Sequence, residues 1–148
     1  MKSDRQTQAE VTLTLRAMFE AYGKRDLNGV LSFWAPDPDI VVIGSGEDEK
    51  CIGINQFVKC LRRDWEQSDS VTIEHKDVAV SMSGSVSWFA TDIIFHGKIA
   101  VEKFTYPARL TGVLEKRDGN WLLMQLHLSA PSAQQERGQS WPKPQPAT

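Results

Sequence analysis

Three side chains in the second half of the sequence could together perform acid–base chemistry: Asp92, Arg109 and His127. An imidazole exchanges a proton near neutral pH. A neighbouring carboxylate would fix its tautomer and raise its pKa, and a guanidinium would stabilise a carboxylate or enolate oxygen. A set of this kind suits proton abstraction beside a carbonyl group. We therefore take Asp92, Arg109 and His127 as the candidate catalytic residues.

Each of these residues also has a purely structural interpretation. Asp92 and Arg109 can form a buried ion pair that fixes strand register, and His127 can be a hydrogen-bonded core histidine. Gln125, a polar candidate for ligand contact, can instead satisfy a backbone group. The sequence leaves both interpretations open.

A predicted β-hairpin over residues 109–129 would position two of the three catalytic candidates. Two alternating runs flank Asp118–Gly119, and an Asp-Gly pair supplies the positive φ angles of a tight primed turn. Strict alternation on the second strand places one set of side chains on a single face: Trp121, Leu123, Gln125, His127 and Ser129. We expect the polar end of this face, with Arg109 and Thr111 across from it, to open into a cavity.

Apolar walls for such a cavity would come from Trp34, Phe57, Trp65 and Trp88. The chain has five tryptophans, and tryptophan often lines pockets because it combines a large apolar surface with a polar N–H group. Ordinary core packing is the alternative for each of these residues.

Two charged segments outside the hairpin also bear on a pocket. The acidic loop that carries Ser45, Glu47 and Glu49 could cap a pocket mouth or simply be solvated. Arg62 and Arg63 fall on the polar side of a predicted helix, where a solvated face is the expected role.

Periodicity predicts the remaining elements. Apolar residues recur at helical spacing over 4–22 and after Asp26 and Gly53, and Asp26 is the expected N-cap of the second helix. Strands are expected over 39–44, 51–52, 71–80, 86–95, 99–116 and 120–130. A hairpin tip is expected at 96–98, with a bulge near Asp77 and a bulge, edge or bend at Pro107.

Composition limits the function classes. A chain of 148 residues with 41% hydrophobic residues predicts one domain over 1–130. Residues 131–148, rich in Pro, Gln and Ser, predict a flexible tail or an arm on a partner. A net charge of −2 argues against nucleic-acid binding.

Nothing in the sequence predicts a metal, a cofactor or membrane association. Cys51 and Cys60 lack metal-ligand spacing, and no phosphate loop or nucleophile elbow is present. The polar N-terminus lacks a signal sequence, and no apolar run reaches membrane length. We therefore expect a cytoplasmic protein with reduced thiols.

The element order resembles the NTF2-like superfamily, and most closely its SnoaL-like and polyketide-cyclase-like domains. The segments that carry the resemblance are 22–34, 41–46, 52–57, 109–121 and 127–129. The resemblance implies an α+β cone of order ααββαββββ, with three helices packed on a strongly curved antiparallel sheet that has a mixed edge. It covers about residues 5–130 and is not specific for a reaction.

The resemblance also implies a function and a site. It suggests a pocket protein for a small hydrophobic carbonyl compound, acting as an acid–base isomerase, cyclase or dehydratase. A non-catalytic ligand-binding or dimeric association domain is the alternative. Steroid isomerases of the superfamily place a tyrosine where this chain has Met18, and a base near Val42 or Ile43, so that chemistry is not expected here. Cyclase relatives use acidic and histidine groups inside the cone, for which Asp92 and His127 are candidates.

A homodimer is the expected oligomeric state. The outer face of the long strands would pair with a second copy. Two sets of side chains are candidates for that surface: Phe104, Tyr106, Leu110 and Leu114, or Leu122, Met124, Leu126 and Leu128.

Overall fold

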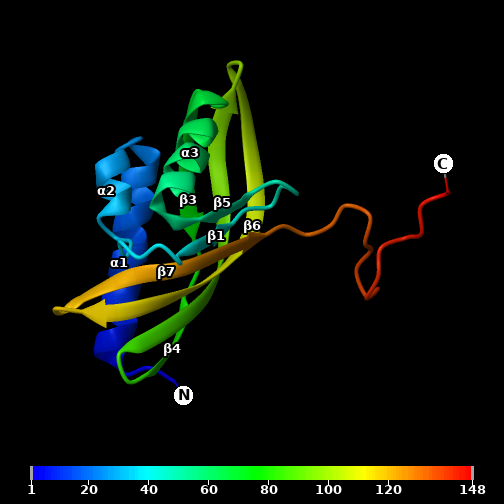
Figure 1. Cartoon of the computed structure of the whole chain (residues 1–148). Helices are drawn as coiled ribbons and strands as arrows, with labels where there is room; N and C mark the ends of the chain where they lie inside the picture. The colour runs from blue at the N-terminus through cyan, green and yellow to red at the C-terminus, as the bar shows by residue number, and fades with distance from the viewer. Residues whose placement is uncertain (1, 148) are drawn as a thin grey trace.

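A computed structural model describes residues 2–147, so residues 1 and 148, at the ends of the expected domain and tail, lie outside it. The chain folds in the expected order of helices and strands, except that the strand expected over 71–80 is two strands (Figure 1). The helices are α1 (Arg5–Gly23), α2 (Leu27–Leu31) and α3 (Gly53–Glu66). The strands are β1 (Val41–Ile43), β2 (Lys50–Ile52), β3 (Ser70–His75), β4 (Ala79–Ser83), β5 (Val86–Ile99), β6 (Glu102–Arg117) and β7 (Asn120–Ser129).

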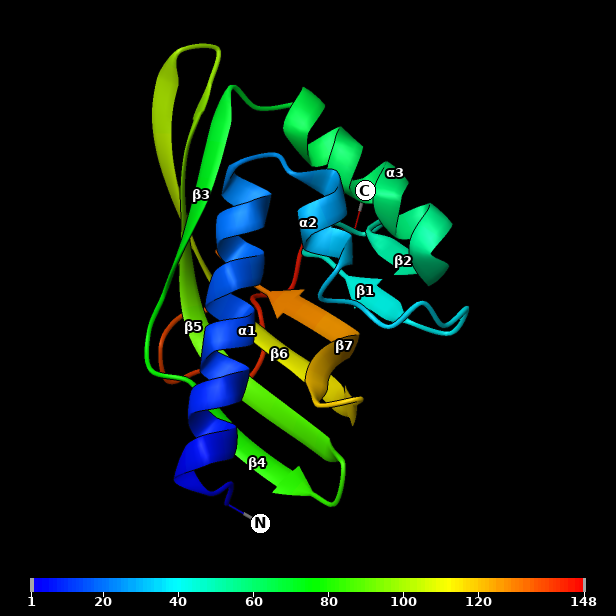
Figure 2. The ribbon, with the colours of Figure 1, turned by 90° about the vertical axis from the view of Figure 1, so that its left-hand side faces the viewer.

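The strands form one mixed sheet, as expected for the α+β class. Its order over the described residues is β2-β1-β7-β6-β5-β3, with β4 also paired to β5. Only the β1–β7 pair is parallel among the pairings of this sheet in residues 2–147. Figure 2 shows α1 in front of the curved sheet, with α2 and α3 beside it above β1 and β2.

Both N-terminal helices begin at an aspartate cap. The Asp4 carboxylate accepts a hydrogen bond from the Thr7 amide at 2.7 Å, and the Asp26 carboxylate accepts one from the Gly29 amide at 3.0 Å. Such caps satisfy amides that have no partner within the helix. The expected cap at Asp26 is therefore confirmed. Val11 and Leu15, in the apolar stripe of α1, are fully buried.

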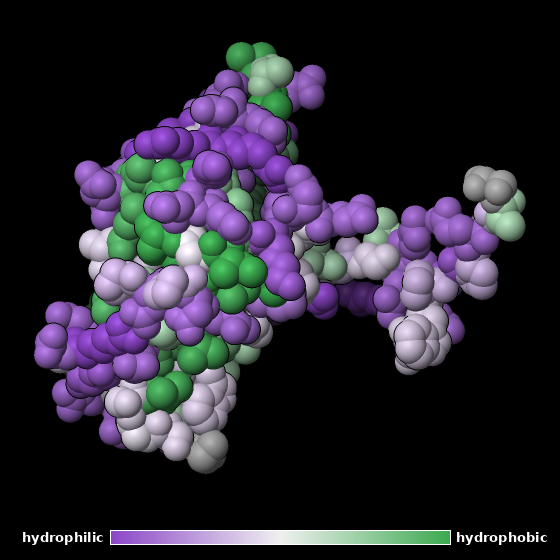
Figure 3. Space-filling model, viewed as in Figure 1, coloured by the Kyte–Doolittle hydropathy of each residue, from purple (hydrophilic) through white to green (hydrophobic). Residues whose placement is uncertain are grey.

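The β5–β6 hairpin turns at Ala100–Val101, not at residues 96–98 as predicted. Ala100 and Val101 have φ angles of 50° and 65°, which suit a primed two-residue turn. Gly97 suggested a turn, but it lies within β5 opposite Phe104. A Cβ added at Gly97 would lie 2.7 Å from the Phe104 ring, so the glycine makes room for that ring. Apolar side chains gather at this tip in Figure 3.

The strands depart from regular pairing at two further places, near Asp77 and at Pro107, where the sequence predicts an irregularity. The expected continuous strand over 71–80 is two strands, because the chain leaves the sheet between His75 and Ala79. Pro107 pairs with Ile94 of β5, but β7 pairs with β6 only from Arg109 onward. Pro107 therefore lies where β6 has β5 on one side only, which confirms the edge position expected for a proline.

A β-bulge in the β6–β7 pair reverses the side-chain pattern of β7. Val113 pairs with Gln125, whereas the next residue, Leu114, pairs with Leu123, so Met124 is the extra residue. An extra residue shifts the inward and outward faces by one position. Leu123 is therefore buried before the bulge, and Leu126 lines a cavity on the same side after it. The strict alternation predicted for β7 is wrong at this point.

Cys51 on β2 and Cys60 on α3 form a disulfide, contrary to the expectation of reduced thiols. The two cysteines are separated by nine positions in the sequence, across the junction between β2 and α3. The disulfide therefore links the edge of the sheet to the helix that covers it.

The chain beyond β7 extends away from the domain in Figure 1. Residues 131–147 are exposed, and the Trp141 side chain is 82% exposed. None of the helices in the described part of the chain is long and apolar enough to cross a membrane.

Candidate functional site

A cavity of about 410 Å³ lies between the helices and the inner face of the sheet. Its volume falls in the range of small-molecule sites, which is roughly 300–1,000 Å³. Its walls are largely apolar and come from elements far apart in the chain. Five of the wall residues are Phe57 on α3, Phe95 on β5, Tyr106 on β6, and Leu126 and Leu128 on β7.

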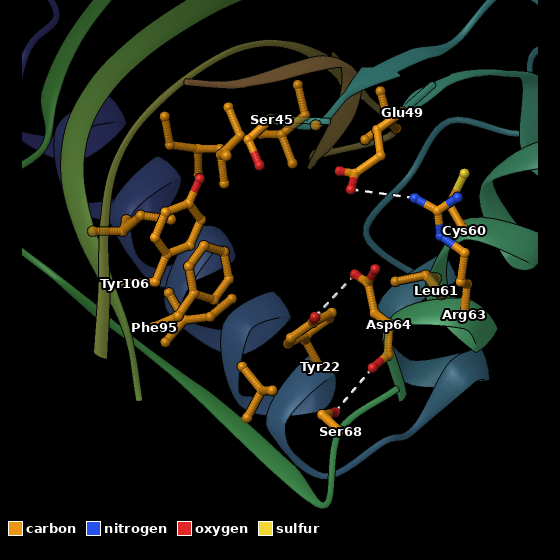
Figure 4. Close-up of a pocket in the computed structure, with 18 of the residues that line it drawn as sticks. Tyr22, Ser45, Glu49, Cys60, Leu61, Arg63, Asp64, Ser68, Phe95 and Tyr106 are labelled. Atoms are coloured by element: carbon orange, nitrogen blue, oxygen red, sulfur yellow. Dashed lines mark hydrogen bonds and ion pairs between the residues drawn. The ribbon is translucent and has the colours of Figure 1, made fainter. Parts of the chain in front are cut away.

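Tyr22 and Asp64 form a hydrogen-bonded pair in this cavity. The Tyr22 hydroxyl, near the end of α1, donates to Asp64 Oδ2, near the end of α3, at 3.0 Å. Figure 4 shows both side chains pointing toward the open centre of the cavity. Burial raises the pKa of the Tyr22 hydroxyl, and the negative charge of Asp64 adds to that effect.

The pKa of the Asp64 carboxyl is also raised above its usual value. Asp64 is exposed at the cavity mouth, but the surrounding protein still desolvates its carboxyl, and this is the largest cause of the shift. The charge of Glu49 acts in the same direction, whereas the Tyr22 hydrogen bond and the charge of Arg63 oppose it. A carboxylate with a raised pKa is a stronger base than an ordinary aspartate.

Trp65 and Arg25 hold the ends of α1 and α3 together and so position this pair. The Trp65 indole N–H donates to the Tyr22 carbonyl at 3.1 Å, and the two rings are 5.8 Å apart between centroids. The Arg25 guanidinium donates to the Trp65 carbonyl, and also to the Ser68 carbonyl at 2.7 Å. These contacts explain why Tyr22 and Asp64 lie on neighbouring helix ends.

A second polar cluster lies at the cavity mouth. Arg63 Nη1 is 2.7 Å from Asp48 Oδ2, and Arg63 Nη2 is 3.2 Å from Glu49 Oε1. Glu49 and Ser45 come from the β1–β2 loop and both line the cavity. The possibility that this loop caps the pocket mouth therefore agrees with the structure. Arg63 is not simply part of a solvated face, because it is ion-paired and also lines the cavity.

The predicted catalytic residues Asp92, Arg109 and His127 lie elsewhere. All three are exposed on the outer face of the sheet, opposite the cavity. Asp92 pairs in register with Arg109, and His127 pairs with Thr111. Arg109 Nε donates to Ser129 Oγ at 3.1 Å. The prediction that these residues line a pocket is therefore wrong. The alternative is also wrong, because exposed residues cannot form a buried ion pair or a core histidine.

These residues face outward because the opposite side of each strand packs toward the helices. The inner positions of β5 include Phe89 and Ile93, so Asp92 must face outward. On β7 the bulge turns Gln125 and His127 to the side opposite Leu123. The polar end of the strand therefore faces solvent.

The predicted ligand-contact residues separate into three groups. Phe57 lines the cavity. Trp34 is buried beside Phe57, with their ring centroids 4.8 Å apart, and Trp65 positions Tyr22 as described above. Trp88 and Gln125 lie on the outer face, where each pairs with Val113.

Sequence reasoning missed Tyr22 and Asp64 as site residues. Tyr22 ends the apolar stripe of α1, so its periodicity indicated core packing. Asp64 precedes Trp65 near the end of an amphipathic helix, where an aspartate is ordinarily solvated. The one available signal was that both are polar residues beside apolar helix faces. In residues 2–147 no three His, Cys, Asp or Glu side chains are placed to hold a metal ion.

The helices that close one face of this strongly curved sheet define an NTF2-like cone, and solved structures show the same fold. An NTF2-like superfamily protein from Salmonella enterica serovar Typhimurium has a TM-score of 0.81 and 15% identity, covering 92% of this chain and 98% of its own. A ketosteroid isomerase-like protein from Erwinia carotovora atroseptica has a TM-score of 0.72 and 16% identity, covering 87% and 99%. An NTF2-like family protein from Streptomyces avermitilis, provisionally named a dehydratase, has a TM-score of 0.77 and 17% identity, covering 88% and 100%.

The family itself follows from a sequence profile. The profile described as "SnoaL-like domain" matches residues 11–133. The chain therefore belongs to the SnoaL-like domain family of the NTF2-like superfamily. No curated protein matches the chain.

Proposed function

We propose that the cavity binds a small, mostly apolar carbonyl compound and that Asp64 acts on it as a general base. The observation that carries this proposal is the Tyr22–Asp64 pair, which points into a largely apolar cavity of about 410 Å³. Perturbed carboxyls in clefts are often functional groups. The family resemblance supports a reaction of the isomerase, cyclase or dehydratase type.

The first step would be proton abstraction from the carbon beside the carbonyl group. The Asp64 carboxylate takes the proton, and the electrons of the broken C–H bond move to form an enolate on the substrate. The protonated Asp64 then returns the proton to a different atom of the same molecule, which gives isomerisation. Tyr22 keeps the carboxylate oriented, since its hydroxyl donates to Oδ2.

Proton exchange tests this proposal without knowledge of the substrate. Cyclic and aromatic ketones are incubated with the protein in deuterated water, and deuterium incorporation beside the carbonyl group is followed by NMR. The proposal expects catalysed incorporation for at least one ketone that also raises the melting temperature. Asp64→Asn should abolish incorporation but not folding.

Asp92→Asn is the matched control, because it makes the same chemical change on the outer face. It should exchange as the wild type does. If Asp92→Asn, and not Asp64→Asn, abolished exchange, the site would lie on the outer face and the proposal would be wrong.

Association into a homodimer through the outer face of the sheet is the second candidate function. Trp88, Ile94 and Val113 are only partly buried there, and Trp88 pairs with Val113. The surface predicted from the sequence is corrected, because Leu110 and Leu114 are buried and Leu126 and Leu128 line the cavity. Trp88→Glu should shift a dimer to monomer in light scattering. A wild-type protein that is monomeric at micromolar concentration would remove this candidate.

A further inference from the structure

Arg63 is the only basic side chain among the cavity-lining residues of 2–147. An arginine in a pocket would ordinarily serve as a clamp for a ligand carboxylate or phosphate, because its planar fork matches two oxygens. Here the fork already holds two carboxylates, Asp48 at 2.7 Å and Glu49 at 3.2 Å. Figure 4 shows the Arg63 guanidinium directed at Glu49 and not at the centre of the cavity.

The remaining charges at the cavity mouth are negative. Asp48, Glu49 and Asp64 together oppose the single guanidinium of Arg63. The partner of Asp64 is the Tyr22 hydroxyl, which carries no positive charge. Arg25 is nearby, but its guanidinium is directed to the backbone carbonyls of Trp65 and Ser68. An anionic ligand would therefore meet net repulsion.

The loop sequence holds Glu49 in this position. A Cβ added at Gly44 would lie 1.9 Å from Glu49 Oε2 and 2.9 Å from Glu49 Cβ. The Glu49 side chain thus folds back over a position that only glycine leaves open. The Gly44 amide also donates to the Glu49 carbonyl at 2.8 Å, which closes the loop.

We propose that Asp48 and Glu49 determine the specificity of the cavity by occupying Arg63, so that the site accepts uncharged ligands and rejects carboxylates, sulfonates and phosphates. This inference rests on the proposed function, because it takes the cavity as the ligand site. It adds the charge class of the ligand and the residues that select it. Removing the two carboxylates frees Arg63 and converts the mouth into an anion-binding site.

Two fluorescent probes with one aromatic skeleton test the inference. N-phenylnaphthylamine is uncharged at neutral pH, and anilinonaphthalene sulfonate carries one negative charge on the same framework. Both are titrated at low ionic strength, where interactions between partly exposed charges are least screened. Wild type should bind the uncharged probe at least about tenfold more tightly, which corresponds to about 1.4 kcal/mol of binding free energy.

The decisive variant is Asp48→Asn with Glu49→Gln. It should tighten sulfonate binding by about tenfold or more and leave the uncharged probe within about twofold of wild type. Gly44→Ala keeps every charge but displaces Glu49, so it should give an intermediate gain. The matched control is Asp39→Asn with Glu47→Gln, which removes the same charge from exposed residues that do not line the cavity. It should leave the ratio of the two affinities unchanged.

A cavity-filling variant, Leu126→Trp, separates the two proposals. Suppose that Leu126→Trp abolishes binding of both probes and that wild type binds the two probes equally well. The cavity is then the binding site, but the inference that it rejects anionic ligands is wrong. If the control double variant changes the affinity ratio as much as Asp48→Asn with Glu49→Gln, net charge and not Arg63 is responsible, and the inference also fails. If Leu126→Trp leaves both affinities unchanged, the probes bind outside the cavity and the proposed function fails with it.

Discussion

The Tyr22 hydroxyl donates to the Asp64 carboxylate at 3.0 Å across the gap between the ends of α1 and α3. This bond favours the ionised form of Asp64, while desolvation favours the neutral form and is the larger effect. The carboxyl therefore binds its proton more tightly in the folded protein than in the unfolded chain. This balance gives a prediction about stability as a function of pH.

Asp64→Asn should raise the melting temperature relative to wild type at pH 7. The pKa of Asp64 in the folded protein is raised above its ordinary value of 3.8. The free energy of unfolding therefore falls as the pH rises from the ordinary pKa through the folded-state pKa, where Asp64 ionises. The gain should disappear below the ordinary pKa, where Asp64 is protonated in both the folded and unfolded states. Thermal melts of both proteins across this range provide the measurement. A gain that is constant with pH would contradict the argument.

Tyr22→Phe should have the opposite effect at neutral pH. It removes the hydrogen bond to the ionised carboxylate, so the pKa of Asp64 should rise further and stability should fall by about 1–2 kcal/mol. Carboxyl carbon NMR can follow the titration, and urea denaturation the free energy of unfolding. Tyr106→Phe, on the opposite wall of the cavity, is the control and should leave the Asp64 titration unchanged.

The Cys51–Cys60 disulfide should stabilise the protein. Closing a loop between cysteines nine positions apart is expected to contribute about 2–3 kcal/mol by restricting the unfolded chain. A reductant should therefore lower the melting temperature of wild type but not of the Cys51→Ser, Cys60→Ser double variant. Mass spectrometry after thiol alkylation reports the bond directly. Two freely alkylated thiols in non-reduced, freshly purified protein would contradict the prediction.

Leu123→Ala should destabilise the protein by about 2–5 kcal/mol, because it leaves a cavity in a packed core. The Leu123 side chain is fully buried, and its backbone forms an isolated parallel β-bridge with Trp34. Leu13→Ala removes the same atoms from a side chain that is 60% exposed, so it should cost far less. Equal losses of unfolding free energy for the two variants would show that β7 packs differently.

The β5–β6 turn offers a stabilising substitution. Ala100 and Val101 adopt positive φ angles that L side chains disfavour, and a β-branched valine is especially unsuited to them. Replacing the pair by Asn-Gly should raise the free energy of unfolding by about 1–2 kcal/mol. The same pair placed at His96–Gly97, inside β5, should instead destabilise. A loss at positions 100–101 would mean that the hairpin turns elsewhere.

Local sequence signals were sufficient for most elements of the fold. Helical periodicity identified α1 and α3, the Asp26 cap marked the start of α2, and Asp118–Gly119 predicted its turn, with φ angles of 49° and 80° in the structure. These signals work because they depend on residues within one or two turns of each other. The tip of the β5–β6 hairpin was misplaced because Gly97 has a packing role that only its cross-strand neighbour Phe104 reveals.

The site itself was decided by tertiary structure. The sequence determined two faces for each long strand, but not which face the helices would cover, since alternation is the same in both cases. The bulge at Met124, set by the pairing of β6 with β7, turned His127 outward and Leu126 into the cavity. Tyr22 and Asp64, which lie 42 positions apart, become partners only when the C-terminal ends of α1 and α3 come together, because that contact has no periodic signature along the chain.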